Sequence, residues 1–548
     1  MKNFIKEFEN TLKQRWNELA VGDYGGHHDT YAEMAEKIAV MHEMWQAAGL
    51  NKGDKIAISA RSSKAWAETF FGAITGGYVS VQLFPGFLPA DTMSLVIHSD
   101  ASILYIEKPS FTNMDFDKMP KLMGVIDILS GELLAARGKF SKAYASAEEI
   151  YRKNYPSGIS VDQVSYHIMD MDDVCAIMYT SGSTGNPKGV MLTIRNFSAN
   201  VDEIPRRFPY KAGDNYLSIL PFAHIFALET DCILPLTLGL HLTILWVPPI
   251  PMNIKKAMCE LKPKILMSVP LIMSKFVDWT IGEIIGSESG KAKLQDAENN
   301  QEFCTKLHDM IMEALGGNIE GFATGGAAIP HEIESLLAFK LKMPFLTGYG
   351  MTECAPLICC GTIGKYKSKS CGSKLEGYAD IRYDSPDPKH IAGEIQVKGD
   401  CVFVGYYKNP EATAAVMTSD GWFRTGDMGT TDDEGTVYIV GRCKNMLLST
   451  NGQNIYPEEI EVVLNGLPYV AESLVVQRGN RLYALIVPQA EIVTQDNLSA
   501  ESLDAVMKHN IVKLNSLIPD YSAISGFELV MDAFAKTPKG SIKRFMYQ

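Results

Sequence analysis

The chain has 548 residues, enough for about three or four domain-sized units that each bury a core. Hydrophobic residues make up 46% and charged residues 21%, which is typical of a soluble globular protein. The net charge of −13 argues against nonspecific binding to nucleic acid or to an anionic membrane, because both need positive surface.

Cysteine usage favours a reducing compartment. The 10 cysteines are scattered and form neither a CxxC pair nor a Cys/His spacing typical of a metal site. Cys359 and Cys360 are adjacent, which is poor geometry for an ordinary disulfide. We therefore expect free thiols and a cytoplasmic location.

The N-terminus lacks the uninterrupted apolar core of a signal peptide. Its apolar residues predict one face of an amphipathic helix instead. That face would hold Phe4, Phe8, Leu12, Trp16 and Leu19. Because the polar face mixes both charge signs, we expect the helix to pack on the body rather than anchor in a membrane.

Residues 232–250 are almost uncharged and approach the length of a membrane span. Pro235, Gly239, Pro248 and Pro249 interrupt this run. A buried helix followed by a buried strand over residues 240–245 explains it better. No transmembrane segment is expected, and the sequence leaves peripheral membrane contact open.

The N-terminal half alternates between helical and strand patterns. Helices are expected at residues 30–48 and 65–75, and strands at 55–59, 78–83, 102–106, 215–220, 264–269 and 319–324. This alternation predicts parallel sheets with crossover helices. Residues 107–172 look polar and irregular, and residues 282–300 look like a solvated excursion.

Residues 179–189 are the stretch around which a site is expected. They read Tyr179-Thr180-Ser181-Gly182-Ser183-Thr184-Gly185-Asn186-Pro187-Lys188-Gly189. Glycines allow a tight turn, and the hydroxyls and the lysine supply donors for phosphate oxygens. A Walker A loop has a different glycine spacing and opens a helix, whereas a strand pattern follows here. The alternative is a Gly/Ser-rich surface hairpin.

The pattern changes twice in the C-terminal part. From about residue 372, short alternating runs predict an antiparallel sheet or barrel, with a hairpin turn at residues 432–435. Beyond Lys444, the chain predicts a helix at 457–466, strands at 473–477, 482–487 and 527–531, and a helix at 500–517. About a hundred residues of this mixed pattern would form a small separate domain.

Four further motifs stand at or near the ends of predicted strands. They are residues 325–328 (Gly-Gly-Ala-Ala), 348–353 (Gly-Tyr-Gly-Met-Thr-Glu), 421–427 (Gly-Trp-Phe-Arg-Thr-Gly-Asp) and 441–444 (Gly-Arg-Cys-Lys). Ligands of open α/β folds collect at strand ends, so these motifs are expected to converge on one site.

In order and spacing, these motifs and the 179–189 loop resemble the adenylate-forming (ANL) superfamily of acyl-CoA synthetases, peptide-synthetase adenylation domains and luciferases. The resemblance covers essentially the whole chain. Residues 220–226 and 448–461 look most like the long-chain fatty acyl-CoA synthetase branch. The resemblance implies a large N-terminal body of α/β sheets with a β-barrel-like subdomain, residues 1–443. It also implies a small mobile α+β domain, residues 444–548, with the hinge near Lys444.

The chemistry that this resemblance implies has two steps. A carboxylate attacks the α-phosphate of ATP, which gives acyl-AMP and pyrophosphate, and a thiol, usually coenzyme A, then displaces AMP. Around the phosphates the resemblance implies binding by Thr180, Ser181, Gly182, Ser183 and Gly185, and catalytic roles for Thr184 and Lys188. Glu353 would hold Mg²⁺, whose charge stabilises the leaving group.

The resemblance also places the rest of the nucleotide. Tyr349 would stack on adenine beside Gly326, Ala327 and Gly350, Thr352 would reach the α-phosphate, and Asp427 would accept the ribose hydroxyls with help from Arg442. From the residues alone, a core aromatic at Tyr349 and a turn-forming aspartate at Asp427 remain open.

Two positions come from the substrate side of the resemblance. His224 would line the site near the substrate carboxylate, although a lone histidine between apolar residues is also typical of a core. Gly452 would lie on the segment that enters the site for thioester formation, where a glycine permits close backbone approach. Regions 222–236 and 324–331 would build an apolar pocket for an alkyl chain.

The C-terminus departs from the family pattern. The family usually has a lysine there that touches the carboxylate and the α-phosphate, and alignment puts Ser541 at that position. Ser541 cannot supply positive charge. We favour Lys539 as the substitute, with Lys543 as the second candidate and a solvated surface lysine as the alternative for either.

We therefore expect an acid–thiol ligase that uses ATP, Mg²⁺ and coenzyme A on a medium- or long-chain fatty acid. The nearest alternative transfers the acyl group to an acyl carrier protein or uses another acid. The distant alternative is a non-catalytic adenylate-binding protein, which the Ser541 departure keeps open. Chain length, acceptor thiol and oligomeric state stay open.

Overall fold

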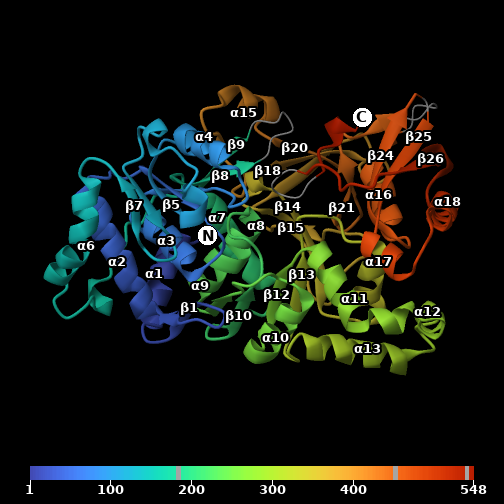
Figure 1. The fold of residues 1–548 in the computed structure, drawn as a ribbon, viewed down its shortest axis with the longest axis horizontal. Helices are drawn as coiled ribbons and strands as arrows, with labels where there is room; N and C mark the ends of the chain where they lie inside the picture. Colours follow the sequence, from blue (N-terminus) through green and yellow to red (C-terminus); the bar gives the residue numbers. More distant parts are fainter. Residues whose placement is uncertain (181–186, 449–453, 480, 537–541, 548) are drawn as a thin grey trace.

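The computed structural model describes residues 1–548 apart from 181–186, 449–453, 480, 537–541 and 548. A large body contains most of the chain, and a smaller C-terminal domain lies beside it (Figure 1). The main core cluster of the large body runs from Phe4 to Val437, and that of the small domain from Ile455 to Ile524. The predicted two-part α/β organisation is confirmed, while the boundary at residues 443 and 444 stays a prediction.

The widest sheet has eight strands in the order β19-β9-β8-β4-β3-β5-β6-β7. They are β3 (Lys55–Ser59), β4 (Val79–Gln82), β5 (Ala101–Ile106), β6 (Gly124–Asp127), β7 (Leu133–Ala136), β8 (Val174–Thr180), β9 (Lys188–Thr193) and β19 (Gly405–Tyr406). The five strands from β8 to β6 pair in parallel, whereas β9, β19 and β7 pair antiparallel at the edges. The predicted parallel sheet with crossover helices is confirmed.

Two further sheets complete the α/β part of the large body. The first has the order β10-β11-β1-β2, formed by β1 (Leu19–Asp23), β2 (His28–Thr30), β10 (Asn215–Ser218) and β11 (His241–Ile244). The second has the order β12-β13-β14-β15-β16, formed by β12 (Ile265–Ser268), β13 (Gly321–Thr324), β14 (Phe345–Gly350), β15 (Leu357–Cys360) and β16 (Ser373–Lys374). Because β12, β13 and β14 are parallel, their carboxyl ends lie at one edge.

The predicted antiparallel region from about residue 372 forms a four-stranded sheet. Its order is β17-β18-β20-β21, with β17 (Asp380–Asp384), β18 (Gly393–Lys398), β20 (Phe423–Thr431) and β21 (Val437–Arg442). Within the described residues, β17 and β21 are edge strands that do not pair with each other, so the sheet is open. The antiparallel prediction is confirmed, but these strands do not close into a barrel.

Helices cover the sheets of the large body (Figure 1). They are α1 (Phe4–Gln14), α2 (Tyr31–Ala48), α3 (Lys64–Thr75), α4 (Pro89–Ser99), α5 (Lys108–Phe111), α6 (Phe140–Asn154), α7 (Ile194–Glu203), α8 (Ile225–Ala227), α9 (Leu234–Leu238), α10 (Pro251–Leu261), α11 (Pro270–Gly286), α12 (Glu288–Gln295), α13 (Gln301–Ala314), α14 (His331–Glu334) and α15 (Pro410–Val416). Two π-helical segments, η4 (Leu228–Ile233) and η5 (Ser335–Lys340), continue α8 and α14.

Local signals explain why the predicted helix over residues 30–48 has those bounds. The Thr30 hydroxyl accepts from the backbone N–H of Glu33, and the Glu33 carboxylate accepts from the backbone N–H of Thr30, which is a capping box. Gly49 ends the helix with a φ of 85°, a left-handed conformation that glycine adopts without steric cost.

The small domain has a mixed pattern, as expected. A two-stranded ribbon, β22 (Leu447–Leu448) with β23 (Asn454–Ile455), precedes a sheet of β24 (Val470–Arg478), β25 (Arg481–Pro488) and β26 (Ile524–Leu529). The helices are α16 (Pro457–Asn465), α17 (Ala490–Gln495) and α18 (Ala500–Leu517). The predicted helix over residues 500–517 is confirmed at both ends.

Two local predictions are wrong. The N-terminal helix ends at Gln14, and Leu19 is an exposed residue of β1 rather than part of the apolar face. Residues 107–172 are not irregular, because they contain β6, β7 and α6. The stretch 282–300 is largely exposed, as expected, but its residues are mostly helical, in α11 and α12.

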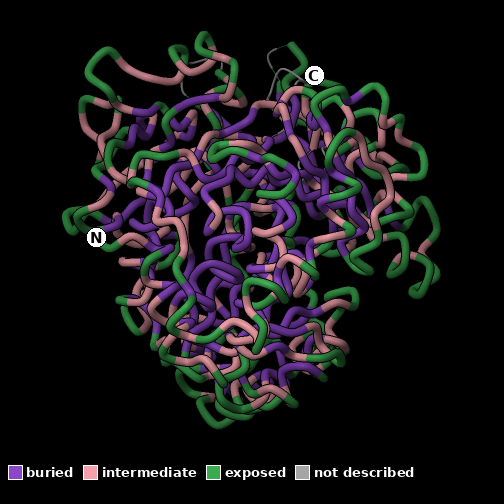
Figure 2. The backbone as a smooth tube through the Cα atoms, turned by 90° about the vertical axis from the view of Figure 1, so that its left-hand side faces the viewer, coloured by how far each residue is buried: buried purple, intermediate pink, exposed green. Residues whose placement is uncertain are grey.

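Buried backbone runs through the centre of the molecule, and exposed backbone surrounds it (Figure 2). Phe4, Phe8 and Leu12 of α1 are fully buried, so this helix packs on the body as predicted. Among the helices of the described residues, none is both long and apolar enough to cross a membrane. Residues 232–250 instead hold the end of η4, α9 and β11.

Candidate active site

The strands β8 and β9 bring the two ends of the predicted phosphate loop together. They pair antiparallel, with Thr180 opposite Lys188, and the Thr180 hydroxyl donates to the Lys188 carbonyl at 3.5 Å. A strand therefore follows the loop, as predicted and unlike in a Walker A motif. The predicted residues Ser181, Gly182, Ser183, Thr184 and Gly185 lie outside the described residues.

A cavity of about 1200 Å³ collects most of the predicted residues that the structure describes. Its lining includes Thr180, Lys188, His224, Gly326, Gly350, Thr352, Glu353 and Arg442. Three predicted residues are not in the lining: Ala327, which is exposed beside Gly326, and Tyr349 and Asp427. The strand-end motifs thus converge on one site, as the sequence predicts.

The end of β14 explains how Thr352 and Glu353 reach the cavity. A Cβ atom at Gly350 would lie 2.0 Å from the Pro356 carbonyl oxygen, so the close approach of these two segments requires glycine. The short turn over Thr352–Cys354 follows and leaves Thr352 largely buried at the cavity wall. The Glu353 carboxylate Oε1 accepts a hydrogen bond from the Tyr406 hydroxyl at 2.8 Å.

Asp427 and Tyr349, which are not in the cavity lining, form a hydrogen-bonded group with Arg442, which is. Asp427 lies opposite Arg442 in the β20–β21 pair and is 3% exposed. Its Oδ1 lies 2.7 Å from the Arg442 Nε, and its Oδ2 accepts from the Tyr349 hydroxyl at 2.6 Å. Burial raises the pKa of Asp427, and the Arg442 charge opposes this. Both oxygens of Asp427 thus have protein donors, and the predicted ribose contact stays a prediction.

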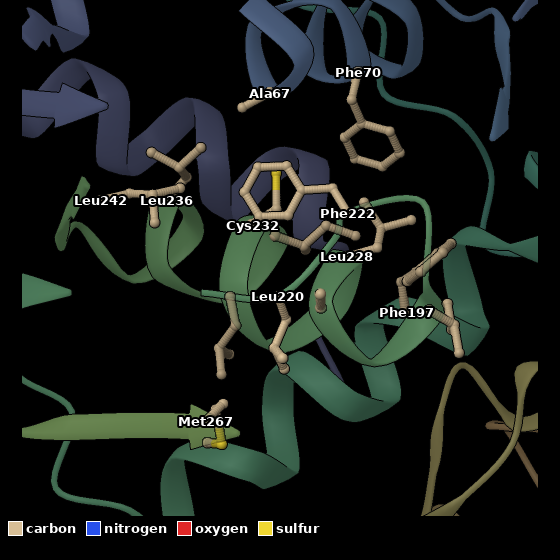
Figure 3. Close-up of a cluster of buried hydrophobic side chains, with 14 of the residues drawn as sticks. Ala67, Phe70, Phe197, Leu220, Phe222, Leu228, Cys232, Leu236, Leu242 and Met267 are labelled. Carbon is tan, nitrogen blue, oxygen red and sulfur yellow. The ribbon is translucent and has the colours of Figure 1, made fainter. Parts of the chain in front are cut away.

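His224 lies in the cavity lining and is half-buried rather than enclosed in the core. Its Nδ1 accepts from the backbone N–H of Phe226 at 3.3 Å, which caps the start of α8. The preceding Phe222 is fully buried, and its ring lies 5.4 Å from that of Trp66. Figure 3 shows Phe222 near Phe70 of α3 and Cys232 of η4, so the residue two positions before His224 is held in the packed core.

Apolar side chains contribute to the cavity lining. They include Ile204, Phe208, Ile225, Phe226, Met267, Ala323 and Leu357. Thr230, Thr324 and Arg207 add polar groups, and the Arg207 guanidinium is already held by Glu203 and by the carbonyls of Cys360 and Lys374. The Thr324 hydroxyl is buried and has no hydrogen-bond partner within the described residues.

The small domain supplies a second side of the same cavity. Lys444, Asn445, Glu458, Lys543 and Arg544 all contribute to its lining. The Arg544 guanidinium pairs with both carboxylate oxygens of Glu461, at 2.8 Å from Oε1, which ties the C-terminal segment to α16. Lys539, Ser541 and Gly452 lie outside the described residues.

Residues 8–407 match the family described as AMP-binding enzyme, which is well over half of the chain. The chain belongs to the AMP-binding enzyme family. The match ends before the small domain, whose contribution to the cavity comes from the structure.

Relatives of this AMP-binding enzyme cover most of its length. The chloroplastic long-chain-fatty-acid–acyl-carrier-protein ligase AEE15 of Arabidopsis thaliana is 25% identical over 89% of this chain and 76% of the relative. Long-chain-fatty-acid–CoA ligase 4 of Saccharomyces cerevisiae is 28% identical over 84% and 72%, respectively. The crystal structure of ATP-bound MatB from Rhodopseudomonas palustris has the same fold, with a TM-score of 0.77 at 21% identity over 99% and 97%.

In this AMP-binding enzyme, Glu353 fits a magnesium ion by its chemistry. Its carboxylate lines the cavity, Oε1 is oriented by Tyr406, and Oε2 makes no hydrogen bond or ion pair within the described residues. Carboxylate oxygens suit Mg²⁺. A second acidic group, His27, Asp29 and Glu33, places ligand atoms within 4.8 Å of one another, but Lys37 and Lys64 already pair with Asp29.

Sequence reasoning missed Tyr406, Glu458 and the apolar residues Ile204, Phe208 and Met267. Tyr406 lies in a two-residue strand, which has no periodicity to detect. A signal existed for Glu458, because acidic residues are favoured in the first turn of a helix that Pro457 opens. That signal predicts a helix start and says nothing of the cavity.

Proposed function

We propose that this AMP-binding enzyme activates a carboxylic acid, of the medium- or long-chain fatty acid class, with ATP and transfers the acyl group to coenzyme A. One observation carries the proposal. A single cavity joins a phosphate-loop lysine, a threonine and a carboxylate from strand ends to lysines of the small domain. Such a site can neutralise a triphosphate and exclude water from a reactive adenylate.

Each described residue has a defined task in this proposal. Lys188 binds phosphate oxygens, and the Thr352 hydroxyl donates to the α-phosphate. The Tyr349 ring stacks on adenine, and the hydrogen bond of its hydroxyl to Asp427 sets the ring orientation. Mg²⁺ held by Glu353 would supply positive charge to the leaving pyrophosphate.

The acid is proposed to lie against the apolar lining residues, with its carboxylate near His224. The apolar side chains of Phe226, Met267 and Leu357 in the cavity lining favour an apolar acyl group over a charged one. The alternative acceptor is an acyl carrier protein. We include it in the test because the relative in Arabidopsis thaliana is a ligase for that acceptor. A second alternative is another acid.

The small domain is proposed to turn about a hinge near Lys444 between two poses, one for each step. Gly452 would enter the site in the second pose. For the first, Lys543 is a supported donor of the charge missing at Ser541, because it lines the cavity together with Thr352 and Glu353. Lys539, which the C-terminal sequence pattern favours, is the alternative donor of this charge.

The test measures AMP and pyrophosphate from ATP and palmitate, with and without coenzyme A and with a no-enzyme control. Turnover that needs both the fatty acid and coenzyme A supports the ligase. AMP release only with a carrier protein would support the alternative acceptor. If ATP binds but no acid from a panel of short, long and aromatic acids yields AMP, the chain is a non-catalytic adenylate-binding protein.

A further inference from the structure

A short segment, residues 403–408, contacts both the strand that follows the phosphate loop and the turn that carries Glu353. This strap pairs through β19 with β9, so that Tyr406 lies opposite Val190. The backbone N–H of Tyr407 donates to the Gly189 carbonyl at 2.7 Å, directly after Lys188. The backbone N–H of Phe403 donates to the Glu353 carbonyl at 2.8 Å. The strap therefore links the phosphate-loop strand to the turn that carries Glu353.

The Tyr406 side chain repeats this link inside the cavity. Its hydroxyl donates to Oε1 of Glu353 at 2.8 Å, and the Lys188 ammonium lies 4.8 Å from the centre of its ring. Tyr406 is 6% exposed, and its ring lies edge-on to that of Phe403, with centroids 4.9 Å apart. One side chain thus contacts the proposed phosphate-binding lysine and the proposed metal-binding carboxylate at once.

The chemistry of the two contacts differs. A hydroxyl that donates to a carboxylate makes a charge-assisted bond that fixes the carboxylate orientation and leaves Oε2 directed to other ligands. The ring face attracts the lysine ammonium and limits where it can reach. A tyrosine hydroxyl carries its proton at neutral pH, so it can donate to the Glu353 carboxylate.

We propose that Tyr406 is a positioning residue that holds Lys188 and Glu353 in register for a metal–nucleotide complex. This inference rests on the proposed function, since it needs ATP and a divalent cation in this cavity. It predicts that the Tyr406 hydroxyl supports metal binding through Glu353 and that the Tyr406 ring supports phosphate binding through Lys188. The two roles can be separated by substitution.

The experiment compares Tyr406→Phe, Tyr406→Leu and Tyr407→Phe in the full chain. Tyr407→Phe is the matched control, because its hydroxyl also donates to a carboxylate, Asp100 at 3.1 Å, but Tyr407 does not line the cavity. Electron paramagnetic resonance of free Mn²⁺ measures binding of Mn²⁺ with ATP, and calorimetry in EDTA measures metal-free ATP. Neither readout depends on turnover.

We expect Tyr406→Phe to weaken Mn²⁺ binding with ATP about tenfold while metal-free ATP binds as in the wild type. Tyr406→Leu should also weaken metal-free ATP, by about fivefold. Wild-type Mn²⁺ binding in Tyr406→Phe, or equal losses with and without metal, would overturn the proposal, as would a matching loss in Tyr407→Phe.

Failure of the proposed function is separable from failure of this inference. If the wild type binds Mn²⁺ and ATP but activates no acid, the ligase assignment fails while the three variants still decide the role of Tyr406. If the wild type binds no ATP, both are overturned. In an active enzyme, Tyr406→Phe should raise the Mg²⁺ concentration needed for half-maximal ATP–pyrophosphate exchange and leave the KM for the acid unchanged.

Discussion

The two sides of the cavity are built differently. On the large-body side, Thr352, Glu353 and Arg442 follow or belong to strands that share one continuous core. On the small-domain side, Lys543 and Arg544 follow strands that pack around a separate core. There the Arg544–Glu461 pair, rather than a shared sheet, ties the C-terminal segment to α16.

This difference predicts different roles for the two sides of the cavity in nucleotide binding and in the two reaction steps. Groups on the large-body side are preorganised by strand pairing, so we expect them to set affinity for the nucleotide and the rate of its chemistry. Groups on the small-domain side would move together with that domain. We therefore expect each of them to affect either adenylation or thioester formation, but not both. Substitutions on each side test this distinction.

The largest effect is expected on the large-body side, at Glu353→Gln. Loss of the carboxylate charge should lower the rate of ATP–pyrophosphate exchange by about 10²–10³-fold, because the pyrophosphate charge is no longer offset. Glu394→Gln is the matched control: this carboxylate also lines the cavity but pairs with Arg424 at 2.8 Å. Equal losses in both variants would contradict a specific role for Glu353.

On the small-domain side, Lys543→Ala should lower adenylation by about 10²-fold, because a positive charge near the α-phosphate is lost. Thioester formation from supplied acyl-AMP should stay close to wild type. Lys539→Ala is measured beside it. If Lys539→Ala loses adenylation and Lys543→Ala does not, the missing charge comes from Lys539, as the sequence alone suggested.

A smaller effect is expected at Tyr349→Phe. Removing the hydroxyl leaves the buried Oδ2 of Asp427 without its donor, which should cost about 1–3 kcal/mol in the free energy of unfolding and weaken AMP binding. Denaturant titration and calorimetry measure the two effects. Tyr383→Phe on β17 is the control, because the Tyr383 hydroxyl is buried without a hydrogen bond within the described residues.

The smallest effect is expected far from the cavity, at His241. Burial lowers the pKa of His241 to about 4, and the Nε2 of this ring lies 2.6 Å from the Nδ1 of His28, whose pKa is also lowered. Between an unfolded pKa near 6.5 and the folded value, the unfolded chain binds more protons, so stability falls as pH falls.

We therefore expect the thermal unfolding midpoint to drop between pH 7 and pH 5, and to drop less in His241→Gln. Differential scanning calorimetry of both proteins at the two pH values measures this. An identical drop in the variant would assign the acid sensitivity to other groups. Adenylation at pH 7 should be unchanged in His241→Gln, since neither histidine lines the cavity.

Local signals were sufficient for much of the fold. The capping box at Thr30 and the glycine at position 49 predict both ends of α2. Motifs at strand ends predict a shared site, because parallel strands end at one edge of a sheet. Lys188, Thr352 and Glu353 could be found in this way. Their roles came from family resemblance and stay proposals.

What could not be predicted depends on a sparse local pattern or on partners distant in sequence. Residues 107–172 read as irregular because α6 exposes much of its length and buries only Phe140, Ala143, Ala147 and Tyr151, of which the two alanines add little to an apolar pattern. Whether the sheet of β17, β18, β20 and β21 closes into a barrel depends on whether its edge strands pair. The alternation of apolar and polar residues does not determine this. Tyr406 gains its place only when β19 reaches β9.

The pairing of β19 with β9 bears on how the enzyme is made. Tyr406 and Val190 are more than two hundred residues apart in sequence, so the hairpin of β8 and β9 leaves the ribosome long before its outer neighbour does. Long-range pairings form slowly because the intervening chain must be ordered first. A nascent chain that stops short of β19 therefore exposes the edge of β9, and it is the form in which aggregation or chaperone capture is expected.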